Sequence, residues 1–280
     1  MKQINAKVIV LICAKNEEGY IEKTLNALLN QTLKPYKIVV VDDGSKDKTP
    51  KILREYRKKY DNIVVFTRPD RGFSALGTYL MADTYNTGLK YIQEQDYDYL
   101  MIVGADTILP PNYIEEMVKR FVEDPKLGIA SGMDPDEPIS KIHVSGTGRM
   151  IRGTIAKKMG LLPRIYAWET YEIVFVKING YHAKNFPDLH FKHQRPGGKG
   201  HMRSYYGWGR AMRELGYHPL YAFGRFMMNI IRGHPSWAIA MMRGYIKGGR
   251  NDPKLLPMKK YMWNYQRSYL SHLPLKLIPF

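Results

Sequence analysis

Three short polar segments, each directly after a run of apolar residues, carry the side chains best suited to chemistry. They are residues 15–18 (Lys-Asn-Glu-Glu), residues 42–45 (Asp-Asp-Gly-Ser) and residues 104–106 (Gly-Ala-Asp). Carboxylates gathered in one pocket are unfavourable unless a cation or hydrogen-bond donors satisfy them. A divalent metal ion together with a nucleotide would do so. The three segments therefore predict a site for a metal-bound nucleotide.

The sequence lacks the glycine-rich loops that usually hold phosphate groups. It contains neither G-x-x-x-x-G-K-[ST] nor G-x-G-x-x-G after the first apolar run. This gives no support to a P-loop protein or to a dinucleotide-binding dehydrogenase. A diphosphate bound here must be neutralised by a metal ion and by basic side chains.

The polar segments follow apolar runs that read as strands buried on both faces. These strands are predicted at residues 8–12, 38–41, 63–66 and 99–103. Helical spacing of apolar residues follows the first three, at residues 21–29, 52–56 and 75–93. This alternation predicts an α/β fold with an open, mostly parallel sheet. Such sheets bind ligands at the carboxyl ends of their strands, where the three segments would lie side by side.

The second half of the chain is less regular. We expect a strand near Ile129, a helix at residues 166–178, and a loop with one short strand at residues 181–193. Basic, aromatic helices are predicted after Ser204. The sequence thus predicts a catalytic domain over residues 1–203 and a helical region over residues 204–280.

The order of these segments resembles the inverting glycosyltransferases of family 2, which have the GT-A nucleotide-diphospho-sugar fold. The match covers roughly residues 7–220. Residues 14–18 resemble the opening motif P-A-Y-N-E-E, and residues 40–45 resemble V-D-D-G-S. The resemblance implies that donor contacts come from five positions, with Glu17 near the ribose, Asp43 at the base and Arg71 near the diphosphate. These five are Ala14, Lys15, Glu17, Asp43 and Arg71.

Residues 104–106 fall on the family's D-x-D motif, with Gly104 in place of the first aspartate. The resemblance implies that Asp106 holds a divalent ion, Mn²⁺ or Mg²⁺, on the donor diphosphate. Gly104 and Ala105 are expected at the donor. Because the first aspartate reaches the sugar or ribose, its replacement puts the donor-sugar contacts in doubt and keeps an inactive relative as an alternative.

Residues 168–172 (Trp-Glu-Thr-Tyr-Glu) resemble the acidic helix that supplies the general base in inverting members. We expect Glu169 to be this base, with Glu172 as its rival. The two lie three residues apart and so share one helix face. A second carboxylate nearby can raise the pKa of the first and suit it to proton abstraction.

Residues 186–198 also resemble a segment of one subgroup, in which a histidine precedes a basic residue, proline and glycine. The resemblance implies that His193 is a metal ligand and that Arg195 contacts the diphosphate. His190 and His193 face opposite sides of a strand, so one of them is structural. We expect His193 to be the functional one.

The charge of the chain is one-sided. The net charge is +17, yet after Ile173 the only acidic residues are Asp188, Glu214 and Asp252. Residues 226–232 and 237–243 mix apolar, aromatic and cationic side chains, as an interfacial helix does. No signal peptide is evident, and no apolar stretch is long enough to span a bilayer. We therefore expect peripheral, monotopic association with an anionic membrane surface, at the cytoplasmic face of the cell membrane.

These observations together predict a glycosyltransferase that moves a hexose from a GDP-, UDP- or dTDP-linked donor, GDP-mannose included. The acceptor would be a lipid-linked or membrane-proximal glycan. A nucleic-acid-binding protein would explain the basic region, but the acidic strand ends would repel phosphate and no nucleic-acid-binding motif is visible. A sugar-1-phosphate nucleotidyltransferase would need a glycine-rich basic loop after the first strand. A single cysteine, Cys13, excludes a disulfide framework and a cysteine-based zinc site.

Overall fold

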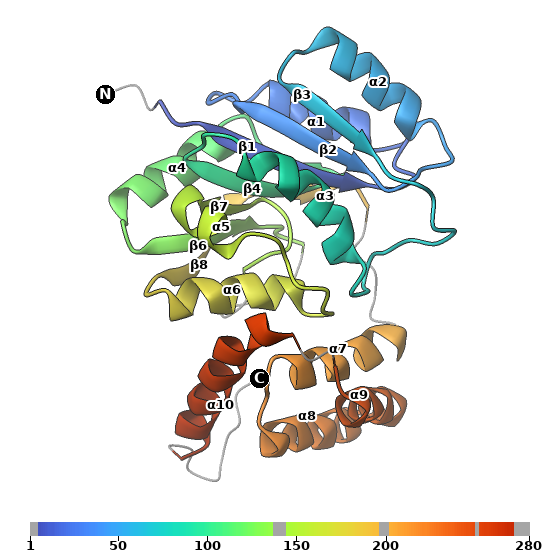
Figure 1. Cartoon of the computed structure of the whole chain (residues 1–280), viewed down its shortest axis with the longest axis vertical. Helices are drawn as coiled ribbons and strands as arrows, with labels where there is room; N and C mark the ends of the chain where they lie inside the picture. The colour runs from blue at the N-terminus through green and yellow to red at the C-terminus, as the bar shows by residue number, and fades with distance from the viewer. Residues whose placement is uncertain (1–4, 137–143, 196–201, 250–251, 272–280) are drawn as a thin grey trace. The chain divides into compact units, whose positions relative to one another are not determined.

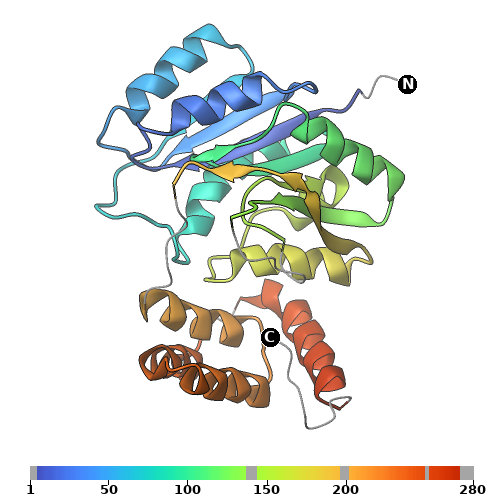
Figure 2. The ribbon, with the colours of Figure 1, turned by 180° about the vertical axis from the view of Figure 1, so that it is seen from behind.

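The computed structural model describes residues 5–136, 144–195, 202–249 and 252–271 (Figures 1 and 2). Contacts between residues divide the chain into two compact units. The first unit comprises Met1–Ala75, Ala82–Leu162 and Asn179–Gly197, and the second comprises Leu76–Met81, Pro163–Ile178 and Gly198–Phe280. None of the helices described is long and apolar enough to cross a membrane.

The first unit is built on a sheet whose described strands run in the order β3-β2-β1-β4-β7-β6-β8. The strands are β1 (Val8–Ala14), β2 (Lys37–Asp42), β3 (Ile63–Thr67), β4 (Tyr99–Gly104), β6 (Leu127–Met133), β7 (Arg149–Arg152) and β8 (His182–His190). β1 pairs in parallel with β2 and β4, and β2 with β3, whereas β7 runs antiparallel to β4 and β6. The predicted α/β class with a mostly parallel sheet is confirmed.

Helices cover both faces of this sheet (Figure 1). They are α1 (Ile21–Leu29), α2 (Thr49–Lys59), α3 (Met81–Gln93), α4 (Tyr113–Glu123) and α5 (Gly153–Met159). Val8, Val10 and Ile12 of β1 pack with apolar residues of α1, α2 and α4. On the other face α3 packs so closely that a Cβ atom at Gly88 would lie 2.5 Å from Leu11 Cδ1. Burial on both faces explains why these strands are continuous apolar runs.

Two short strands extend the first unit beyond the main sheet. β5 (Thr107–Ile108) pairs antiparallel with β9 (Lys192–His193). The segment predicted as a loop with a short strand thus contains the nine-residue strand β8 and then β9. β8 is an edge strand of mostly polar, exposed residues with Pro187 inside it. It therefore lacks the apolar alternation by which strands are recognised.

The helix predicted from residue 75 begins only at Met81. Gly77 has a φ of +69°, in the left-handed region that ends regular helix. Thr78 then accepts hydrogen bonds from the Leu80 amide at its side chain and from the Met81 amide at its carbonyl, both at 3.2 Å. These two bonds form a turn directly before the helix.

The second unit consists of helices in the part of the chain that is described. They are α6 (Trp168–Ile178), α7 (Met202–Glu214), α8 (Pro219–Ile231), α9 (Pro235–Lys247), a 3₁₀ turn (Pro253–Leu255) and α10 (Leu256–Ser271). α7 and α9 touch through their backbones. A Cβ atom at Gly209 would lie 1.8 Å from the Met241 carbonyl oxygen, and one at Gly244 would lie 2.1 Å from that of Tyr206. Glycine is therefore required on both helices at this crossing.

Candidate active site

The three polar segments singled out in the sequence meet at one edge of the sheet. Ala14 at the end of β1 is level with Asp42 of β2, and Cys13 is level with Gly104 of β4. The buried Ala14 fixes this meeting point, because its carbonyl accepts the Asp43 amide at 2.8 Å. The parallel register thus places the residues that follow the three strands next to one another, as predicted.

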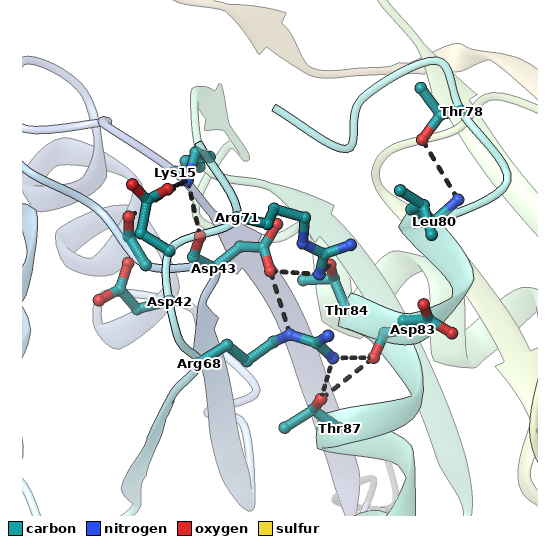
Figure 3. Close-up of polar contacts among 12 residues, drawn as sticks. Lys15, Asp42, Asp43, Arg68, Arg71, Thr78, Leu80, Asp83, Thr84 and Thr87 are labelled. Carbon is teal, nitrogen blue, oxygen red and sulfur yellow. Dashed lines mark hydrogen bonds and ion pairs between the residues drawn. The ribbon is translucent and has the colours of Figure 1, made fainter. Parts of the chain in front are cut away.

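Asp43 and Arg71, both predicted at the donor, form an ion pair (Figure 3). Arg71 Nη2 lies 2.7 Å from Asp43 Oδ1, and Arg68 Nε lies 3.1 Å from the same oxygen. The Arg68 guanidinium also donates to Thr87 Oγ1 at 2.6 Å and to the Asp83 carbonyl. Asp43 is only 3% exposed, so the two guanidinium groups hold its carboxylate rigidly at the end of β2.

Lys15 is held by the loops around it. Its ammonium group donates to the carbonyls of Asp43 at 2.9 Å and Gly44 at 3.2 Å, and pairs with Asp70 Oδ1 at 2.6 Å. An ammonium group has three donors, and these contacts use all three. Lys15 therefore fastens the loop after β2 to the loop after β3. Gly44 has a φ of +74°, and a Cβ atom there would lie 2.4 Å from Asp70 Cα, so only glycine fits.

Glu17 and Asp106, predicted at the ribose and the metal, are joined by Arg195. Arg195 Nη2 donates to Glu17 Oε1 and Arg195 Nε donates to Asp106 Oδ2, both at 2.7 Å. Burial raises the pKa of Glu17 although Arg195 opposes this. Burial would also raise the pKa of Asp106, but His193 and Arg195 outweigh it and the pKa is lowered. Asp106 is therefore ionised at neutral pH and able to bind a cation.

His193 lies beside Asp106, as the resemblance implied. Pairing of β9 with β5 brings His193 level with Thr107, and its Nδ1 lies 3.9 Å from Asp106 Oδ1. Its amide donates to Asp134 Oδ2 at 2.8 Å, which fixes the backbone here. His190 is exposed, and its Nε2 instead contacts the Pro187 carbonyl at 2.7 Å. The structure thus brings His193, and not His190, to the acidic pair.

Gly104 leaves no room for the family's first aspartate. A Cβ atom at Gly104 would lie 2.8 Å from Thr107 Oγ1 and 3.1 Å from Asp106 Oδ1. Thr107 cannot easily move, because it is fully buried and its hydroxyl bonds that of Thr147 at 2.9 Å. Thr147 Oγ1 also accepts the Gly104 amide at 2.8 Å. Two threonine hydroxyls therefore occupy the space that a side chain at residue 104 would need.

Ala105 and Arg195 complete the set of donor positions implied by the resemblance. Ala105 is buried, and its carbonyl accepts a hydrogen bond from Thr24 Oγ1 at 2.8 Å, which ties the end of β4 to α1.

Four further residues at the site, Arg68, Asp70, Asp134 and Thr147, were not predicted. The contacts that place them at the site join residues 15 to 59 positions apart in the chain, so local sequence patterns carry no signal for them.

The residues at the strand ends fit a divalent ion that is shared with a substrate. No group of three or more His, Cys, Asp or Glu side chains in the described residues is arranged to hold a metal ion alone. Asp106 and His193 together offer a carboxylate and an imidazole. Mg²⁺ and related ions typically take one or two carboxylates from the protein and the rest from substrate phosphates and water. The Arg195 guanidinium between Glu17 and Asp106 shows that this position accepts positive charge.

Glu169 and Glu172, the candidates for the general base, lie on α6 in the second unit. The two carboxylates differ in access to solvent. Glu169 in the first turn of α6 is partly exposed, whereas Glu172 is only 1% exposed. A base that takes a proton from an acceptor must be reachable by that acceptor. Exposure therefore favours Glu169.

Known proteins resemble this chain in both sequence and fold. Residues 9–143 match the model of glycosyl transferase family 2. Poly-beta-1,6-N-acetyl-D-glucosamine synthases of Staphylococcus aureus (strain MSSA476) and Staphylococcus epidermidis are 31% and 30% identical over 125 and 122 residues. These matches cover 45% and 44% of this chain but only 28% and 27% of the synthases.

Solved structures share the fold at low sequence identity. Mannosyltransferase PcManGT from Pyrobaculum calidifontis, in complex with GDP-Man and Mn²⁺, gives a TM-score of 0.58 at 18% identity, covering 97% of this chain and 77% of that one. Residues 1–349 of S. aureus TarS in complex with UDP give a TM-score of 0.52 at 17% identity, covering 72% and 63%. The predicted GT-A fold is thus confirmed. Residues 9–143, which contain the three polar strand ends, thus match glycosyl transferase family 2, as the resemblance in the sequence predicted.

Proposed function

We propose that the chain transfers a hexose from a nucleotide-diphosphate sugar to a lipid-linked or membrane-proximal glycan acceptor, with inversion at the anomeric carbon. The observation that carries this proposal is the alternating array of charges at the ends of β1, β2 and β4. There Asp43 is held by two arginines, and Arg195 links Glu17 to Asp106. Such an array offers carboxylates for a ribose and a base, and guanidinium groups for a diphosphate.

Each residue of the array has a proposed role. Asp43 recognises the base, Glu17 the ribose, and Arg71 and Arg195 the diphosphate. Asp106 and His193 would hold Mn²⁺ or Mg²⁺, which when bound supplies positive charge against the departing nucleotide. Lys15, Ala14, Gly104 and Ala105 shape the pocket through backbone contacts. For its contact with the diphosphate, Arg195 has to leave at least one of the two carboxylates that it bridges.

Glu169 is proposed to accept the proton of the acceptor hydroxyl as that oxygen attacks the anomeric carbon. The oxygen–hydrogen bond breaks as the new glycosidic bond forms, and the nucleotide diphosphate leaves from the opposite face. A carboxylate with partial solvent access, such as Glu169, suits this step better than the buried Glu172.

The donor is identified by thermal-shift measurements with GDP-, UDP- and dTDP-sugars, each with Mn²⁺, Mg²⁺ or EDTA. A ligand that binds only the folded chain raises its melting temperature. At a ligand concentration of a hundred times the Kd, the free energy of unfolding increases by about 2.7 kcal/mol. We expect a metal-dependent shift with one nucleotide, and GDP-mannose is the first arm of the panel. The absence of a shift with every pair would contradict the proposed donor site.

We also propose that the second unit attaches the enzyme to the cytoplasmic face of the cell membrane. α8 carries large apolar side chains that are exposed: Leu220, Phe223, Met227, Ile230 and Ile231. At 100° per residue they fall within an arc of about 100°, so they form one stripe, called here the α8 stripe. A contiguous apolar stripe in a strongly basic chain is what an anionic bilayer surface binds.

Removing part of the α8 stripe is expected to weaken membrane binding. Burial of one such side chain is worth about 1.5–3 kcal/mol, and even half of that from two residues corresponds to roughly tenfold. We therefore expect Phe223→Ser with Ile231→Ser to reduce flotation with phosphatidylglycerol vesicles at least tenfold. The control is Tyr36→Ser with Val122→Ser, which alters exposed apolar residues of the first unit. Equal flotation of both variants would reject the stripe as the membrane contact.

A further inference from the structure

The second unit contains a cavity of about 390 Å³ that the proposed transfer reaction does not use. Its wall includes Arg213, Lys247 and Lys259, together with the aromatic rings of Tyr217 and Trp263. Arg213 is in the last turn of α7, Lys247 in the last turn of α9, and Lys259 in the first turns of α10. Cavities that bind small molecules are typically about 300–1,000 Å³, so this one can hold a small ligand.

Within the described part of the chain, none of Arg213, Lys247 and Lys259 forms an ion pair with an acidic side chain. Arg213 instead lies over the Tyr245 ring, 5.6 Å from its centroid. Cations that converge on one cavity repel one another unless an anion joins them.

One carboxylate, that of Glu214, also borders the cavity. It is 1% exposed, and its Oε2 accepts the Tyr166 amide at 2.9 Å, so it is directed into the protein. Arg213 and Lys247 also lie at helix C-termini, each of which carries about half a negative charge. Subtracting Glu214 and two such half charges from three cations still leaves about one net positive charge at the cavity.

We propose that this cavity binds a phosphate-bearing group, which Arg213, Lys247 and Lys259 hold by charge-assisted hydrogen bonds. Guanidinium and ammonium groups are the side chains that bind phosphate oxygens, and an arginine can do so with two parallel bonds. Tyr217 and Trp263 supply apolar surface for the organic group of a phosphate ester. The residues that line this cavity are not among those of the donor site, and the proposal does not rest on the proposed transfer reaction.

The test compares two variants of the full chain that lose equal charge. In the cavity variant, Arg213→Gln, Lys247→Gln and Lys259→Gln are combined. In the control variant, Arg243→Gln, Lys254→Gln and Lys260→Gln remove three exposed cations of the same unit that do not line the cavity. Binding of inorganic phosphate, followed by calorimetry, is expected to fall at least about tenfold in the cavity variant alone. The single change Lys247→Glu, at an exposed position, is expected to have the same effect and guards against misfolding of the triple variant.

Vesicles distinguish the sources of the phosphate group. If inorganic phosphate competes with phosphatidylglycerol vesicles, and the cavity variant binds those vesicles less well than the control does, the ligand is a lipid headgroup. If only phosphate binding depends on the cavity, the ligand is a soluble phosphate compound. The proposal would be overturned if the cavity and control variants lost phosphate binding equally, or if the unmodified chain bound no phosphate. The thermal shift produced by the nucleotide-sugar donor is measured on the same variants. It reports on the donor site alone, so failure of the cavity proposal and failure of the donor-site proposal can be told apart.

Discussion

Replacing Asp106 by asparagine is expected to abolish the metal-dependent rise in melting temperature that a nucleotide sugar produces. Asparagine keeps the shape of the side chain but loses its charge, and a neutral amide is a much weaker ligand for Mn²⁺ or Mg²⁺. Saturating donor should stabilise the unmodified chain by several degrees, since about 1 kcal/mol shifts the melting temperature of a 150–250-residue protein by roughly 2–4 °C. In the Asp106→Asn variant the shifts with metal and with EDTA should be equal.

The same substitution should lower kcat/KM by about a thousandfold, because a bound metal supplies several kcal/mol of charge stabilisation. Asp106→Asn also breaks the ion pair with Arg195, so some loss of stability without ligand is expected. Asp188→Asn is the matched control, since Asp188 pairs with Arg120 at 2.5 Å in the same unit. It should lose at most the same basal stability and keep the metal-dependent shift. A normal shift in Asp106→Asn would remove this residue from the metal site.

Those features of the fold that depend on short stretches of chain could be predicted from the sequence. The continuous apolar run of β1 and the Asp-Asp-Gly-Ser turn after β2 each identify a buried strand and its end. The parallel order of strands then follows from the alternation with helices, and with it the meeting of Lys15, Asp43 and Asp106. Only one short strand was predicted at residues 181–193, and the nine-residue length of β8 was not recognised, because its residues are mostly polar and exposed and burial leaves no pattern in them.

The contacts between the predicted residues could not be foreseen. Arg195 reaches Glu17 and Asp106 across 178 and 89 residues of chain, and it can do so only because β9 pairs with β5. Lys15 was expected at the donor, but its ammonium group is already engaged by two carbonyls and Asp70. Such pairings are set by the tertiary fold and not by the spacing of residues within a motif.

In the basic helical region after Ser204, the sequence likewise did not show which apolar side chains are buried. Residues 226–232 and 237–243 are similar in composition, yet their side chains differ in burial. In α9, Ala238 and Met241 are buried, and Trp237 stacks on Tyr205 with ring centroids 4.7 Å apart. In α8 most large apolar side chains are exposed. Only the packing of the helices distinguishes a core from a surface that is available to a membrane.

Glu169→Gln is expected to lower kcat by about 10²–10⁴-fold, the usual contribution of a general base, while donor binding stays intact. Glutamine cannot take a proton from the acceptor hydroxyl, but it has the same length and makes little change to a partly exposed helix position. The acid limb of the pH profile of kcat should disappear together with the base. The melting temperature and the metal-dependent donor shift should match those of the unmodified chain.

Glu172→Gln provides the comparison, because it makes the same chemical change one helical turn away on α6. Glu172 is buried, so its replacement is expected to act on the free energy of unfolding and to lower the melting temperature, with the acid limb of the pH profile retained. If Glu169→Gln stays active while Glu172→Gln is inactive with an unchanged melting temperature, Glu172 is the base. If both variants stay active with normal pH profiles, neither residue accepts the proton, and the base lies outside α6.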